Sequence, residues 1–157
     1  MKPDTIKTGK LLRSFALERE AINEDDRTVE LSFSSEEPVE RWFGNEILGH
    51  KRGQARLDRL KNRGAVLSNH DVDQQIGVVE KVTMGGDRVG RAVVRFGRGA
   101  LATEVFNDVV DGIRAHVSVG YVIHKMKLEE SADDGPDTYR ATDWEPYEVS
   151  IVSVPAD

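Results

Sequence analysis

The stretch Ala100–Ile123 reads ALATEVFNDVVDGIRAHVSVGYVI, and its hydrophobic period changes part-way along. Apolar residues first recur every three or four positions, which predicts a helix with one buried face over residues 100–111. Gly112 then suits the left-handed conformation that often ends a helix. From His116 the period becomes two, which predicts a strand with Ser118 on the side opposite its main apolar face. The stretch therefore predicts one helix that leads directly into a strand.

The rest of the chain indicates mostly strands. Residues 76–84 and 89–96 are rich in valine and flank a Gly-Gly-Asp-Arg turn, whose glycines would supply the positive φ of a tight hairpin. Shorter extended segments predict strands over residues 28–33, around residues 39–47 and over residues 148–154. We therefore expect a β-rich α+β fold.

The length and composition suit one compact unit. The chain has 157 residues, of which 38% are hydrophobic and 32% charged, and we expect a single domain over residues 1–157. Residues 129–137 are acidic and contain glycine and proline, so we expect a mobile loop there. Residues 1–10 are expected to form a flexible N-terminal tail.

The segment from Lys51 to Arg63 is strongly basic. Leu57 and Leu60 lie at helical spacing within it, which predicts a helix with a solvated basic face. The alternative is a docking patch for an acidic partner. His50, beside this segment, is expected at the surface.

Composition excludes several classes of function. The net charge of −6 argues against a general nucleic-acid binder, because such proteins gain affinity by neutralising phosphates. The chain has no cysteine, which excludes disulfides, thiolate zinc sites and cysteine-dependent catalysis. Neither a secretory signal nor a membrane-spanning segment is evident, so we expect a soluble, cytoplasmic protein that does not bind membranes.

Three polar residues lie within or beside strongly apolar strand segments: His70, Ser118 and Glu148. A serine hydroxyl needs an imidazole to accept its proton and a third group to orient that imidazole, so these residue types suit an acyl-transfer triad. Their spacing does not fix their geometry. The ordinary alternative is a small strand residue, a histidine bonded to the backbone and a solvent-facing glutamate.

A catalytic serine also needs donors for the negative charge that develops on the substrate oxygen. These donors are usually backbone amides, which have no residue-type signature. Gly120 either keeps the approach to Ser118 open or marks a β-bulge, and the sequence supports both interpretations.

Other catalytic motifs do not fit. The residues around Ser118 lack the first glycine of Gly-x-Ser-x-Gly, and Tyr121 stands where a Ser-x-x-Lys motif needs lysine. The chain has no His-Glu-x-x-His motif. His116 and His124 could share a strand face, but further metal ligands are not evident. We therefore expect no metal and no cofactor.

Three blocks of the sequence resemble the motifs of phage prohead proteases, in that family's order. They are a histidine block, a serine block after the amphipathic helix, and a C-terminal block, which here read LSNHD (67–71, followed by IGVV at 76–79), SVGY (118–121) and EVSIVSVPA (148–156). The resemblance spans roughly residues 28–157.

This resemblance implies a fold related to the herpesvirus assemblins, a bent, orthogonally packed β-barrel with a few flanking helices. It also implies a serine endopeptidase with Ser118 as nucleophile and His70 as general base. Herpesvirus relatives use a second histidine as the third member, whereas the phage motif offers an acid, here Glu148. Asp71 is the reserve candidate, although neighbouring residues on a strand point to opposite sides.

The resemblance further implies partners and a place of action. Such an enzyme acts inside the assembling procapsid in the host cytoplasm, where it cleaves extensions of the major capsid protein, the scaffold and often itself. Self-association is expected. The alternative is a non-catalytic β-barrel that serves as a capsid scaffold or assembly module, because a fold can persist without its active site.

Overall fold

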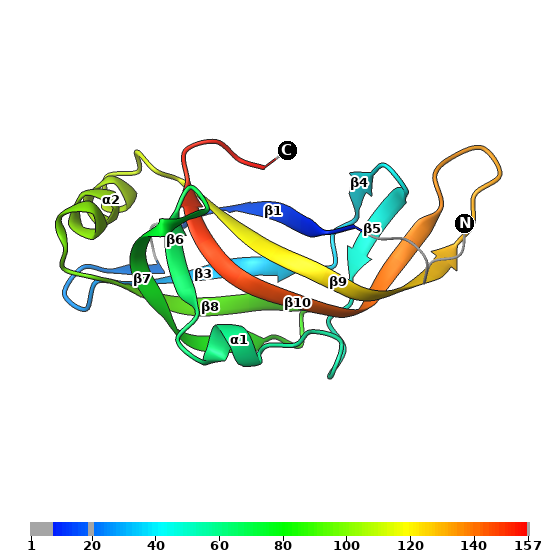
Figure 1. Cartoon of the computed structure of the whole chain (residues 1–157), viewed down its shortest axis with the longest axis horizontal. Coiled ribbons are helices and arrows are strands. Elements are labelled where there is room, and N and C mark those ends of the chain that lie inside the picture. The colour runs from blue at the N-terminus through cyan, green and yellow to red at the C-terminus, as the bar shows by residue number, and fades with distance from the viewer. Residues whose placement is uncertain (1–7, 19–20, 157) are drawn as a thin grey trace.

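The computed structural model describes residues 8–18 and 21–156. These residues form ten strands and two helices, which Figure 1 shows as one strongly curled sheet with the helices beside it. Both helices contribute buried side chains to the core. The strands are β1 (Lys10–Ala16), β2 (Ile22–Asn23), β3 (Thr28–Ser35), β4 (Val39–Arg41), β5 (Gly44–Leu48), β6 (Ala65–Ser68), β7 (Asp71–Met84), β8 (Val89–Phe96), β9 (His116–Glu130) and β10 (Thr138–Val152). The helices are α1 (Asp58–Lys61) and α2 (Ala100–Val110).

The strand order is β1-β9-β10-β6-β7-β8-β3-β2, and β5 joins β10 while β4 pairs with β5. The sheet curls far enough for β1 to contact β3, although the two are not paired. The β-rich, bent architecture expected from the sequence is therefore confirmed, in the form of a half-barrel.

The long strands β9 and β10 form the centre of this arrangement. They pair with each other in antiparallel register, and β10 also runs parallel to β6. The last described strand is thus inserted between two strands that precede it in the chain. This insertion brings the β6–β7 turn next to the beginning of β9 (Figure 1).

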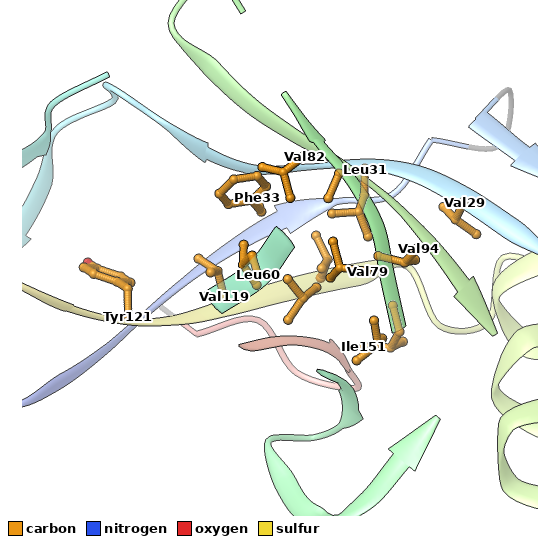
Figure 2. Close-up of a cluster of buried hydrophobic side chains, with 14 of the residues drawn as sticks. Val29, Leu31, Phe33, Leu60, Val79, Val82, Val94, Val119, Tyr121 and Ile151 are labelled. Atoms are coloured by element: carbon orange, nitrogen blue, oxygen red, sulfur yellow. The ribbon is translucent and has the colours of Figure 1, made fainter. Parts of the chain in front are cut away.

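The core lies inside the curl. Figure 2 shows side chains of β3, β7 and β8, such as Phe33, Val79 and Val94, facing Val119 and Ile151 of β9 and β10. All five are at most 2% exposed. Alternate residues of each strand therefore point into the core, as a sheet with one buried face requires.

The helix α2 packs through the apolar stripe that the sequence predicts. Its buried residues are Ala102, Val105, Phe106 and Val109, and the ring of Phe106 lies 5.1 Å from that of Phe96. Gly112 follows with a φ of +75°, so the predicted helix and its left-handed end are confirmed. No helix in the described part of the chain is long and apolar enough to cross a membrane.

The predicted hairpin is confirmed as β7 and β8, and the predicted strands correspond to β3, β4 with β5, and β10. Two details differ. In the hairpin turn the positive φ belongs to Arg88 (+63°), not to the glycines. The last strand begins at Thr138, well before Glu148, because its first half pairs with β5 and the far end of β9.

The terminal and loop predictions are partly wrong. Residues 1–7 of the expected tail lie outside the described residues, but Lys10 already begins β1, which pairs along its whole length with β9. Residues 129 and 130 end β9, so the expected loop is limited to residues 131–137. Its mobility stays a prediction.

The expectation for His50 is wrong, and that for the basic segment is confirmed in part. The basic side chains are exposed to solvent as predicted, but the helix is shorter than expected. Only Asp58–Lys61 is helical, and the residues before it form turns. His50 is 7% exposed: its Nδ1 donates to the carbonyl of Leu48 (2.7 Å), and its Nε2 accepts from Ser34 Oγ (2.8 Å). Burial lowers the pKa of His50, because desolvation disfavours the charged imidazolium.

Candidate active site

Ser118 lies near the beginning of β9, on the face of the sheet that points away from the core. Its neighbours across the two adjacent strands are Ser14 of β1 and Ser150 of β10. The residue is only 1% exposed, so its hydroxyl is held within a polar layer and not in open solvent.

His70 lies in the two-residue turn between β6 and β7. Asn69 and His70 have φ values of +51° and +61°, and the flanking residues Ser68 and Asp71 pair with each other. Positive φ at both central residues is the geometry of a type I′ hairpin turn, which matches the twist of the strands on either side. The turn therefore presents the imidazole at the end of the sheet.

Hydrogen bonds fasten this turn to the end of β10. The amide of Asn69 donates to the carbonyl of Ile151 (3.0 Å), and the amide of His70 donates to Ser150 Oγ (2.9 Å). The amide of Ser153 in turn donates to Asn69 Oδ1 (3.0 Å). These contacts set the position of His70 relative to β10, and hence to β9.

The imidazole of His70 connects the other two candidate residues. Its Nε2 lies 2.8 Å from Ser118 Oγ, and its Nδ1 is hydrogen-bonded to Glu148 Oε1. The carboxylate accepts on its other oxygen from Ser150 Oγ (2.9 Å). With Nδ1 protonated towards the carboxylate, Nε2 has a free lone pair to accept the proton of Ser118.

Glu148 reaches His70 because of an irregularity in β10. Pro146 pairs with Tyr121 and Glu148 pairs with Gly120, so Tyr147 is an extra residue between two consecutive pairs of β9. Such a bulge re-aims the side chains next to it. Glu148 is 6% exposed, and its charge is matched by donors from His70 and Ser150.

Gly120 leaves the space that this bulge needs. A Cβ atom at residue 120 would lie 2.6 Å from Glu148 Oε1 and 2.8 Å from Cζ of Tyr147. Both contacts are shorter than side-chain carbon atoms tolerate, so only glycine fits without a shift. The bulge that the sequence allowed at Gly120 is on the partner strand β10, opposite the glycine.

The remaining candidates have other partners. Asp71 accepts from the amide of Asp73 (2.9 Å) and is not the residue bonded to His70 Nδ1. His124 pairs with Glu145 (3.1 Å), away from His116. Within residues 8–18 and 21–156, no group of three or more histidine, aspartate or glutamate side chains is placed to hold a metal ion.

Sequence reasoning missed two residues of the site, Ser150 and Tyr147. Ser150 was detectable, because residues two apart on a strand share a face and Ser150 follows Glu148 at that spacing. Tyr147 was not, since a one-residue bulge leaves no pattern in the composition of a strand.

The comparisons with known proteins bear on this arrangement. The family model of the caudovirus prohead serine proteases matches residues 46–157, which include all three residues of the hydrogen-bonded chain. The chain belongs to this family. The resemblance noted in the sequence to phage prohead proteases is therefore confirmed.

Two further matches agree with the family. The chain is 45% identical over 130 residues to a protein of Halomonas phage phiHAP-1 named "Major capsid protein". That match covers 81% of the chain but 21% of the relative, so the chain spans about a fifth of the relative's length. The solved structure of the bacteriophage T4 capsid assembly protease shares the fold, with a TM-score of 0.61 and 14% identity over 93% of this chain and 98% of that one.

Proposed function

We propose that this prohead protease is a serine endopeptidase of procapsid maturation, with Ser118, His70 and Glu148 as its catalytic triad. The observation that carries the proposal is the position of His70, whose two ring nitrogens contact Ser118 Oγ and Glu148 Oε1. Family membership supports the same reaction class.

The proposed mechanism follows from the order of these contacts. Ser118 Oγ attacks the scissile carbonyl while its proton passes to His70 Nε2, and Glu148 stabilises the imidazolium that forms. His70 then protonates the leaving amine, which yields an acyl-enzyme on Ser118. A water molecule, deprotonated by the same imidazole, hydrolyses the acyl-enzyme and restores the serine. The proposed chemistry needs no metal or cofactor.

The substrates we propose are the major capsid protein and the scaffold, cleaved inside the assembling procapsid in the host cytoplasm. The Halomonas phage relative supports this, because a protein of that name contains a segment 45% identical to this chain. Cleavage of the chain itself, self-association and organisation as one protease domain belong to the same proposal.

A matched pair of serine variants tests the proposal. Ser118→Ala should abolish both cleavage of the capsid protein in a co-expression assay and labelling by a fluorophosphonate probe. Ser131→Ala is the control, because the Ser131 hydroxyl donates to Asp137 in the loop after β9, and its loss should leave both signals intact. Cleavage that persists in Ser118→Ala would contradict the triad. If the parent chain neither labels nor cleaves at procapsid-like concentration, a non-catalytic assembly module is the better description.

A further inference from the structure

Tyr147 lies on the same face of the sheet as Ser118 and Glu148. It is the extra residue of the β10 bulge, next to Glu148. Its Cζ and hydroxyl oxygen would lie 2.8 and 2.9 Å from a Cβ atom at Gly120. Gly120 is two residues from Ser118 on β9, so its Cα–Cβ direction is that of the serine side chain. The Tyr147 ring therefore lies one strand repeat from the nucleophile.

The hydroxyl of Tyr147 makes no hydrogen bond to any residue that the structure describes, and the side chain is half-buried. Burial and the charge of Glu148 both raise the pKa of Tyr147, so the phenol stays protonated at neutral pH. The group is therefore a free hydrogen-bond donor next to the hydrogen-bonded chain of Ser118, His70 and Glu148.

The surroundings of this ring suit a bound side chain. Leu12 of β1 pairs with Gly120 and is 38% exposed, which adds apolar surface on the same face. The ammonium group of Lys10 lies 5.1 Å from the ring centroid of Tyr147. The patch formed by Lys10, Leu12 and Tyr147 thus combines apolar area with two donors, the phenol and the ammonium group.

We propose that Tyr147 determines substrate specificity, by packing its ring against a substrate side chain near the scissile bond and donating a hydrogen bond to an acceptor on that side chain. The preferred side chain has an apolar stem and a terminal acceptor. This inference rests on the proposed peptidase function and adds to it the chemistry that the enzyme selects.

The experiment compares two variants on matched peptides. A synthetic peptide library first gives the cleaved sequence, and then kcat/KM is measured for peptide pairs that differ by glutamine against methionine at each position around the scissile bond. At the peptide position whose side chain contacts Tyr147, Tyr147→Phe should lower kcat/KM for the glutamine peptide by about threefold to tenfold. This is the effect expected from the loss of one neutral hydrogen bond. The methionine peptide should be unaffected. Tyr147→Ala should reduce kcat/KM for both.

Two controls separate this role from others. The rate at which a small fluorophosphonate labels Ser118 should be unchanged in Tyr147→Phe, because the probe does not occupy the patch. Tyr139→Phe, on the same strand but beside Phe43, should match the parent chain on every peptide.

Three outcomes would overturn the inference. An unchanged glutamine-to-methionine ratio in Tyr147→Phe at every position would exclude a hydrogen bond to substrate. Slower labelling of Ser118 in the same variant would show that Tyr147 acts through Glu148 instead. If the parent chain is neither labelled nor active, the proposed function fails and the inference fails with it.

Discussion

Single hydrogen bonds determine which ring nitrogen of His70 carries the proton. The carboxylate of Glu148 accepts from Nδ1, which leaves Nε2 as an acceptor facing Ser118. Ser150 fixes both sides of this pair, since its hydroxyl oxygen accepts from the amide of His70 and its proton is donated to Glu148. The tautomer of the histidine thus depends on one buried carboxylate.

Replacing that carboxylate by an amide tests this dependence. Glu148→Gln keeps the shape of the side chain but can present an N–H to Nδ1, which would favour the wrong tautomer. We expect the rate of Ser118 acylation to fall by about 10²–10⁴-fold, as for other triads that lose their acid. Stopped-flow or gel-based labelling with a fluorophosphonate would measure it.

Glu145→Gln is the matched control for this change. Glu145 lies on the same strand and bonds to His124 instead of His70, so its acylation rate should stay close to that of the parent chain. Equal losses in both variants would show that the effect is one of charge in general.

Among the elements, the β7–β8 hairpin depends on a close approach of two backbones. A Cβ atom at Gly77 would lie 2.4 Å from the carbonyl oxygen of Arg95 on β8. Because the obstacle is backbone and not a flexible side chain, the strands themselves would have to separate. Gly86, in the turn of the same hairpin, has nothing within 4 Å of its Cβ position.

Replacement by alanine should therefore destabilise the protein at Gly77 but not at Gly86. Gly77→Ala should lower the free energy of unfolding by about 1–3 kcal/mol, the usual cost of overpacking. Gly86→Ala should change it by less than about 0.5 kcal/mol, as exposed substitutions usually do. Urea unfolding followed by circular dichroism would measure both, and similar losses in the two variants would contradict the close approach.

At the scale of the whole molecule, a buried polar cluster joins strands that lie far apart in the sequence. Arg13 of β1 donates to Glu46 of β5 (2.9 Å), and Tyr121 of β9 donates to the same carboxylate. Arg41 of β4 donates to the Tyr121 hydroxyl (2.7 Å). Burial, followed by the charge of Glu46, raises the pKa of Tyr121 to about 12.

This pKa predicts how stability depends on alkaline pH. The folded protein holds the Tyr121 proton more tightly than the unfolded chain, whose tyrosine titrates near its ordinary value of 10.0. The stabilisation is therefore complete below pH 10 and is lost as the pH rises from about 10 to about 12, by roughly 3 kcal/mol in total.

Denaturant unfolding at several pH values would measure this loss. Tyr121→Phe should unfold at lower denaturant at neutral pH, because it lacks the buried hydrogen bonds. Above pH 10, the free energy of unfolding of this variant should also fall less steeply with pH than that of the parent chain. Parallel curves for the two proteins would contradict the assignment to Tyr121.

The sequence predicted most of the strands, and it named the three residues that the structure brings into one hydrogen-bonded chain, since hydrophobic period and the family motifs depend on local patterns. It could not predict β1, where Arg13 interrupts an apolar segment, because the partner that allows an arginine to be buried is Glu46, far along the chain. Nor could it predict the bulge at Tyr147, which depends on the register between two strands. Both features depend on pairing between segments that lie far apart in the sequence, which local patterns do not reveal.

The position of β10 has a consequence for when the molecule can act. β6 and β9 share no edge, and they become neighbours only through β10, the last strand of the described chain. During synthesis, His70 and Ser118 therefore emerge from the ribosome before the strand that holds β6 and β9 side by side. At that stage the nascent chain also lacks Glu148. If the proposed triad is correct, the order in which the strands are synthesised means that it cannot assemble until translation has passed β10.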